Sequence, residues 1–140
     1  MTYEAVHKAI KRGDIDLLRT ALKSGLDPNL ANKYGWTILM LAAGKGNSKI
    51  GKLMIDSGAD LNKWTANGGV TALSHAVLCG SALFVELLLA EGVSLDCNPY
   101  GMSLDVYLDW VAGFYPEQMR RIRKAFDVAR EARAKNDLRL

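Results

Sequence analysis

The chain has 140 residues, of which 49% are apolar and 24% are charged, and its formal net charge is +3. This length suits one domain, and this composition is that of a folded globular protein rather than a disordered chain. No apolar run reaches the roughly 18 residues needed to span a bilayer, and residues 1–12 alternate polar and apolar side chains, unlike a secretory signal. The two cysteines, Cys79 and Cys97, are too few for a disulfide framework or a four-cysteine zinc site, which favours the reducing cytoplasm.

Three segments of the sequence align with one another without gaps. They are residues 13–29, 46–62 and 80–96, and each begins with a glycine and has a second glycine twelve residues later. Their starts lie 33 and 34 residues apart, and a shorter apolar block precedes each of them. A fixed period in both glycines and leucines is typical of a repeat protein, in which each repeat is one supersecondary unit.

Each repeat is predicted to consist of two short helices. In the second repeat, Thr37 is a suitable N-cap for a first helix that Gly46 ends, because glycine tolerates the left-handed conformation that follows a helix. Ile50 and Met54 lie one helical turn apart in a second helix that ends at Gly58. The third repeat continues the apolar pattern with Leu83, Val85, Leu87, Leu88 and Leu89.

Turn-forming residues separate the first helix of each repeat from the preceding repeat. We call these stretches finger 1 (residues 30–36, LANKYGW), finger 2 (residues 63–70, KWTANGGV) and finger 3 (residues 97–101, CNPYG). Their asparagine, glycine and proline residues favour tight turns over helix or strand.

The two ends of the chain differ from the inner repeats. Lys8 stands where the second repeat has Leu41, so the outer face of the first repeat is polar. Residues 103–114 match a first helix, and Pro116 begins a longer helix that we expect to end near Lys135. The inner stripe of that last helix is predicted to be Met119, Ile122, Phe126 and Ala129.

The block ILMLAAGKG after Thr37 and the block GADLN from Gly58 resemble the ankyrin repeat. The family's signature proline is replaced by Ile38 and Ala72, but the apolar pattern is intact. The resemblance extends over nearly the whole chain and implies an all-α ankyrin-repeat solenoid of about four helix-turn-helix units with divergent capping ends. The implied units are an amino-terminal cap at 1–30, repeats at 31–63 and 64–97, and a carboxyl-terminal cap with an extended last helix at 98–140.

The sequence contains no pattern that predicts catalysis. Asp105 and Asp109 would share one helix face, but no nucleophile or metal-ligand cluster accompanies them, so we expect a solvated face or pairing with the basic last helix. His7 and His75 are expected to be structural, and Gly68 and the glycine after it lack the strand, lysine and helix of a phosphate loop. We therefore expect a protein that is not an enzyme and has no cofactor and no metal.

The resemblance implies that partners bind to the turn tips and to the exposed face of the first helices. Aromatic side chains at exposed turns are costly to hydrate and are enriched in binding hot spots. An alternative is that Trp36 and Trp64 pack locally between neighbouring fingers. The candidate partner-binding residues are Lys33, Tyr34, Trp36, Lys45, Lys63, Trp64, Asn67, Leu78, Tyr100 and Met102.

The predicted function is therefore the binding of a partner protein, by a monomer without a membrane segment. A narrower hypothesis is that the chain blocks a partner enzyme, as an immunity or counter-defence protein does. A third hypothesis is nucleic-acid binding, because residues 1–115 carry 10 basic and 11 acidic side chains (net −1) whereas residues 116–140 carry 8 basic and 4 acidic ones (net +4). Acidic residues interrupt that basic segment, which disfavours nucleic acid. Its cations are Arg120, Arg121, Arg123, Lys124, Arg130, Arg133, Lys135 and Arg139.

Overall fold

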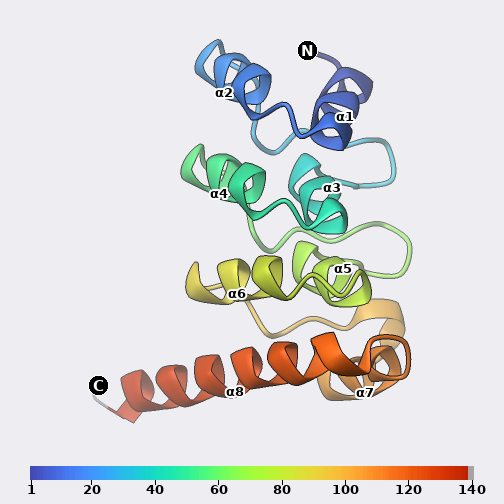
Figure 1. The fold of residues 1–140 in the computed structure, drawn as a ribbon, viewed down its shortest axis with the longest axis vertical. Coiled ribbons are helices and arrows are strands. Elements are labelled where there is room, and N and C mark those ends of the chain that lie inside the picture. The colour runs from blue at the N-terminus through green and yellow to red at the C-terminus, as the bar shows by residue number, and fades with distance from the viewer. Residues whose placement is uncertain (139–140) are drawn as a thin grey trace.

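The computed structural model describes residues 1–138, and Arg139 therefore lies outside the described residues. Within this range four helix pairs stack one on the next, as Figure 1 shows. The helices are α1 (Tyr3–Arg12), α2 (Ile15–Lys23), α3 (Ile38–Lys45), α4 (Ser48–Asp56), α5 (Ala72–Leu78), α6 (Ala82–Ala90), the 3-10 turn η1 (Pro99–Gly101), α7 (Leu104–Ala112) and α8 (Pro116–Leu138). The predicted all-α solenoid is confirmed, while the unit boundaries drawn from the sequence stay a prediction.

The first helix of every pair begins with the same type of cap. A hydroxyl side chain precedes it and accepts a hydrogen bond from the backbone N–H three residues later, which satisfies a donor that the helix cannot pair. The caps are Thr2, Thr37, Thr71 and Ser103, with N···O distances of 3.1–3.3 Å. The glycines Gly13, Gly46 and Gly80, which end the first helices, have φ angles of 66–69°, where other residues are strained.

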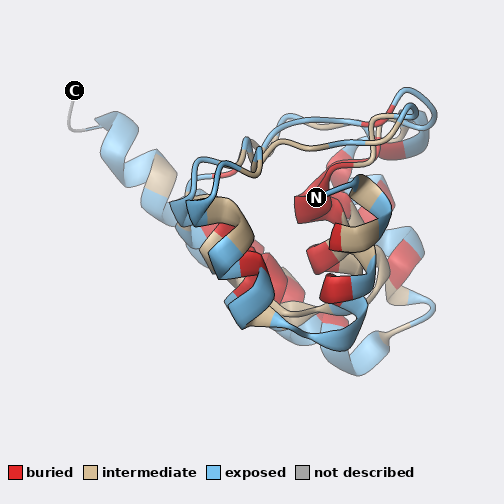
Figure 2. Ribbon diagram, turned by 90° about the horizontal axis from the view of Figure 1, so that it is seen from above, coloured by how far each residue is buried: buried red, intermediate tan, exposed pale blue. Residues whose placement is uncertain are grey.

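The core lies between two columns of helices. The first column is formed by α1, α3, α5 and α7, and the second by α2, α4, α6 and α8; each helix contacts the next one in its own column. Figure 2 shows that the buried residues face the space between the columns. Ile10, Leu39, Leu73 and Leu88 are almost fully buried there. Because a single pair has no partner for its apolar face, these side chains are covered only when neighbouring pairs stack.

The apolar helix α6 buries a different face from the one that its leucines indicate. Leu83 is 57% exposed, whereas Phe84, its neighbour, is fully buried. The ring of Phe84 packs against Gly51 in the middle of α4, where a Cβ atom would lie 2.5 Å from the ring carbon Cε2. Eight of the nine residues of α6 are apolar, so its hydrophobic periodicity cannot define the inner face. The absence of a side chain at Gly51 makes the room that selects Phe84.

Asparagine side chains join consecutive repeats on the finger side of the second helices. The Oδ1 atom of Asn29 accepts a hydrogen bond from the backbone N–H of Asp60 at 2.7 Å. One repeat later, Oδ1 of Asn62 accepts from the N–H of Ser94 at 2.8 Å. The asparagine that closes the aligned segments at residues 13–29 and 46–62 therefore fixes the spacing of each repeat to the next.

The last helix, α8, closes the end of the stack. Met119, Ile122 and Phe126 are buried and Ala129 is half-buried, as the predicted inner stripe requires. The helix ends at Leu138, later than the predicted end near residue 135. Beyond the stripe its side chains are mainly polar, which is the property expected of a solenoid cap.

Arginines of α8 form ion pairs with the neighbouring helices. Arg121 donates to Glu86 of α6, with an Nη2–Oε2 distance of 3.0 Å. Arg130 donates to Asp105 of α7 at 2.8 Å, and Arg123 donates to Asp109 of the same helix. The expected pairing of the two aspartates with the basic helix is confirmed. Because these pairs are exposed, each contributes at most about 1 kcal/mol.

Tyr107 on α7 links the cap to the third repeat through a buried hydroxyl. Its O–H donates to the carbonyl of Ser74 at 2.8 Å, and burial raises the pKa of the phenol. Since the unfolded chain loses this proton above about pH 10 while the folded chain keeps it, stability falls with rising pH by about 1.4 kcal/mol per pH unit. We expect Tyr107→Phe to remove that slope in urea unfolding between pH 9 and 11.5. The exposed Tyr34→Phe control is expected to retain the slope, and an equal effect of both changes would contradict the assignment.

Within the described residues, no helix has both the length and the hydropathy that a bilayer crossing requires.

Candidate interaction surface

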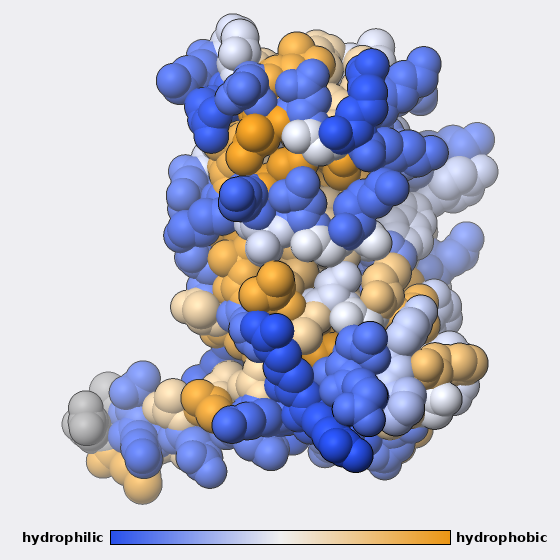
Figure 3. Space-filling model, viewed as in Figure 1, coloured by the Kyte–Doolittle hydropathy of each residue, from blue (hydrophilic) through white to orange (hydrophobic). Residues whose placement is uncertain are grey.

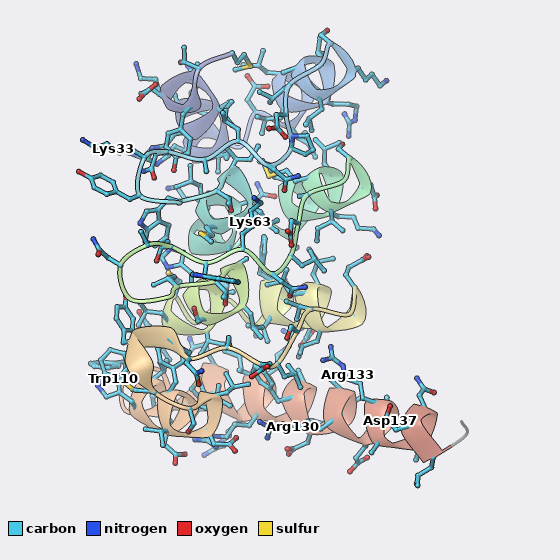
Figure 4. All side chains as sticks on the ribbon, turned by 180° about the vertical axis from the view of Figure 1, so that it is seen from behind. Lys33, Lys63, Trp110, Arg130, Arg133 and Asp137 are labelled. Atoms are coloured by element: carbon cyan, nitrogen blue, oxygen red, sulfur yellow. The ribbon has the colours of Figure 1, made fainter. Side chains whose placement is uncertain are left out.

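The three fingers lie side by side and are joined by backbone hydrogen bonds. The N–H of Ala66 in finger 2 donates to the carbonyl of Tyr34 in finger 1 at 3.0 Å, and the N–H of Tyr100 in finger 3 donates to the carbonyl of Gly68 at 2.6 Å. Figures 1 and 4 show the fingers projecting past the first column of helices. They therefore form one connected platform instead of three independent loops.

Finger 1 is a tight turn organised by the side chain of Asn32. Its Oδ1 atom accepts hydrogen bonds from the backbone N–H groups of Tyr34 and Trp36, both at 3.0 Å. This turn exposes Lys33 and half of the surface of Tyr34. The ammonium group of Lys33 lies 5.0 Å from the centre of the Tyr34 ring, which is a cation–π distance.

Trp36 leaves finger 1 in the opposite direction and is half-buried. Its ring meets the imidazole of His75 on α5 edge to face, with centroids 4.9 Å apart. Burial lowers the pKa of His75, which favours its neutral form. The structure places Trp36 in local packing between finger 1 and α5, as the alternative interpretation proposed.

Finger 2 is held by the buried Thr65. The hydroxyl of Thr65 donates to the carbonyl of Asn67 at 2.6 Å and accepts from the N–H of Val70 at 3.1 Å. Trp64, which precedes it, is 70% exposed, the largest exposed fraction of any aromatic residue described. Beside Trp64 is a hollow of about 510 Å³ between the bases of fingers 2 and 3, whose wall includes Val93. Finger 2 therefore presents a rigidly held indole next to a recess.

Finger 3 presents Tyr100 in a strained backbone conformation. Its φ angle is 53°, the only positive value at a residue other than glycine within residues 1–138, and half of its surface is exposed. The ring covers Gly68 of finger 2, where a Cβ atom would lie 2.9 Å from it. Met102, just after the finger, is half-buried and packs against the core.

The predicted site residues thus fall into two groups. Trp36, Leu78 and Met102 are half-buried and pack against the core. Among residues 1–138, the lysines of the site have no carboxylate within 4.0 Å, so their charges are uncompensated. The exposed members are Lys33, Tyr34, Lys45, Lys63, Trp64, Asn67 and Tyr100.

A row of aromatic side chains on α7 extends the platform and was not among the predicted residues. The ring of Tyr107 lies 6.5 Å from that of Tyr100 and 5.9 Å from that of Trp110, and Phe114 lies 5.3 Å beyond Trp110. Trp110, labelled in Figure 4, is 45% exposed and Phe114 is 59% exposed. The four-residue spacing of Val106, Trp110 and Phe114 is the sequence signal that marks this face.

The chemical groups around the platform are not arranged as a metal site. Within residues 1–138, no three histidine, cysteine, aspartate or glutamate side chains lie together as metal ligands. Burial raises the pKa of the Cys79 and Cys97 thiols, which keeps both in the unreactive protonated form.

Projecting turns on stacked helix pairs define a helical repeat protein of the solenoid class. A profile described as ankyrin repeats in three copies matches residues 6–99, from α1 to finger 3. The chain belongs to the ankyrin repeat family. The matched range leaves out α7 and α8, which form the cap.

Several curated proteins share the repeats. The chain is 34% identical over 77 residues to a fem-1 homolog A-like protein of Mus musculus, which covers 55% of this chain and 12% of that protein. It is 38% identical over 85 residues to the potassium channel KOR1 of Oryza sativa subsp. japonica, with coverages of 59% and 9%. It is 39% identical over 93 residues to an ankyrin repeat, SAM and basic leucine zipper domain-containing protein of Otolemur garnettii, with coverages of 63% and 19%. The chain thus spans less than a fifth of the length of these relatives.

Proposed function

We propose that this chain binds a partner protein through a finger surface formed by Lys33, Tyr34, Lys63, Trp64 and Tyr100, with the α7 aromatic row at its edge. Ankyrin repeats are protein-interaction modules. The observation that carries the proposal for this surface is the 70% exposure of Trp64 on a turn that is hydrogen-bonded to its neighbours. A tryptophan held in water at such a position has a large apolar area available for burial by a partner.

The rigidity of the fingers supports this proposal. Loops that become ordered on binding lose conformational entropy, which reduces affinity. Here Ala66 and Tyr100 join the fingers through their backbone N–H groups before any partner arrives. The finger surface is therefore preorganised for association.

The chemistry of the finger surface favours a partner that is both apolar and acidic. The recess of about 510 Å³ beside Trp64 has room for an apolar side chain. The ammonium groups of Lys33 and Lys63 have no carboxylate within 4.0 Å among the described residues. Carboxylates of the partner near these lysines would accelerate association at low ionic strength.

Affinity capture with the chain as bait tests the proposal. We expect Trp64→Ala to reduce the affinity for the captured partner by about thirtyfold, equivalent to about 2 kcal/mol, measured by biolayer interferometry. Leu83→Ala is the matched control, because Leu83 is similarly exposed but lies on α6 away from the fingers. Unchanged affinity of both Trp64→Ala and Tyr34→Ala would contradict the finger surface.

We further propose that the chain acts as a cytoplasmic monomer without catalytic activity of its own. The two protonated, half-buried cysteines suit a reducing compartment. If the captured partner is an enzyme, titrating it with the chain distinguishes inhibition, in which turnover falls, from scaffolding, in which turnover is unchanged.

A further inference from the structure

A groove between α6 and α8 lies apart from the finger surface. α8 has 23 residues and α6 has nine, so α8 projects past the end of the stack, as Figure 1 shows. The groove has a volume of about 720 Å³, within the range of ligand-binding sites. Figure 3 shows hydrophobic surface over α6 and on the projecting part of α8. The apolar side chains that line the groove include Leu89, Ala90, Ala125, Val128 and Ala132.

The groove also carries uncompensated positive charge. Arg133 points from α8 toward α6 in Figure 4, and its Nη2 atom is buried without a hydrogen-bond acceptor among the described residues. Lys124 lines the same groove and has no carboxylate within 4.0 Å in that part of the chain. The third cation, Arg121, is already paired with Glu86. A buried guanidinium nitrogen without an acceptor is costly, so an incoming carboxylate would gain more here than on an open surface.

We propose that this α6/α8 groove binds an amphipathic helix of a partner protein, whose apolar side chains fill the groove and whose acidic side chains face Arg133 and Lys124. Both walls are helices, whose backbone groups are paired internally and cannot pair with an extended strand. A helical ligand satisfies its own backbone and presents only side chains, which is the helix-in-groove mode.

The length and charge of α8 define this ligand further. The lining residues of α8 extend from Arg121 to Asn136, which corresponds to about 22 Å at about 1.5 Å per residue, so a complementary helix has about 15 residues. Residues 116–140 carry a net charge of +4, and a second copy of α8 would bring like charge to the groove. An acidic helix is therefore favoured over self-association.

The test uses a labelled synthetic peptide of 16 residues, capped at both ends, with a leucine stripe at helical spacing and glutamates beside it. A second peptide has lysine in place of every glutamate. Fluorescence anisotropy measures the affinity of the full chain for both peptides at low salt. The acidic peptide is expected to bind, and the basic peptide is not.

Neighbouring positions on α8 supply matched variants. Arg133→Gln removes the charge in the groove, whereas Lys135→Gln removes an exposed charge outside it; Ala132→Gln fills the groove, whereas Ala134→Gln does not line it. Arg133→Gln and Ala132→Gln are each expected to weaken the acidic peptide by about tenfold, and the two controls by less than about twofold. Circular dichroism verifies that the four variants are folded.

The outcomes are decisive in both directions. Selective loss with the two groove variants, together with unchanged binding by Trp64→Ala, supports a site separate from the finger surface. Absence of binding, equal binding of the basic peptide, or equal effects of the groove and control variants overturns the proposal. Sedimentation that shows a dimer sensitive to Ala132→Gln overturns it as well, because the occupant is then a second copy of the chain.

Discussion

Replacing Phe84 with alanine is expected to lower the free energy of unfolding by about 3–5 kcal/mol, as for other buried aromatic side chains. Phe84 is fully buried in α6, and its ring lies against Gly51 of α4. Gly51 has no side chain that could move into the vacated space, so the substitution leaves a cavity. The loss also weakens the contact between the second and third repeats, on which the stack depends.

Urea unfolding monitored by circular dichroism measures this effect, and the neighbouring Leu83→Ala variant is the control. Leu83 is 57% exposed, and its truncation is expected to change stability by less than about 0.5 kcal/mol. A similar cost for the two variants would mean that α6 is rotated from the orientation described here.

Replacing Phe126 with alanine in α8 is expected to cost about 3–5 kcal/mol at the capped end of the stack. Phe126 is 1% exposed, and the side chain of Arg130 lies over its ring at 5.9 Å. Since repeat proteins are stabilised mainly by contacts between neighbours, the amides of α8 should lose protection from hydrogen exchange before those of α3.

Hydrogen exchange of the native chain and of Phe126→Ala tests this expectation, with Val128→Ala as the control. Val128 lies on the same helix and is 58% exposed. Its truncation removes little packing and should leave the protection of α8 unchanged. Uniform loss of protection over the whole chain in Phe126→Ala would show that the cap and the repeats unfold as one cooperative unit instead.

The repeats and their helices are visible in the sequence because the signals are local. Thr37 and Gly46 delimit α3, and the equivalent residues recur at the 33- and 34-residue spacings. Hydroxyl caps and positive-φ glycines act within a few residues of the helix they bound. Their interpretation therefore does not depend on how the repeats stack.

The candidate site is only partly predictable from the sequence. Trp36 and Trp64 occupy similar finger positions, yet one packs on His75 and the other is 70% exposed. Trp110 was missed because its segment reads as a capping helix, and its exposure depends on which face α8 covers. The destination of each aromatic ring is decided by residues far away in the chain.

By itself the sequence determined the family, the number of helix pairs, the finger positions and the basic character of the last helix. Only the tertiary structure decided that Phe84 rather than Leu83 enters the core, that Asp105 and Asp109 pair with arginines of α8, and that α8 extends beyond α6 to form a groove. The physical reason is the range of the interactions. Capping, turn formation and helical periodicity operate over a few residues, whereas burial and charge pairing depend on segments that only the stacking of repeats brings into contact.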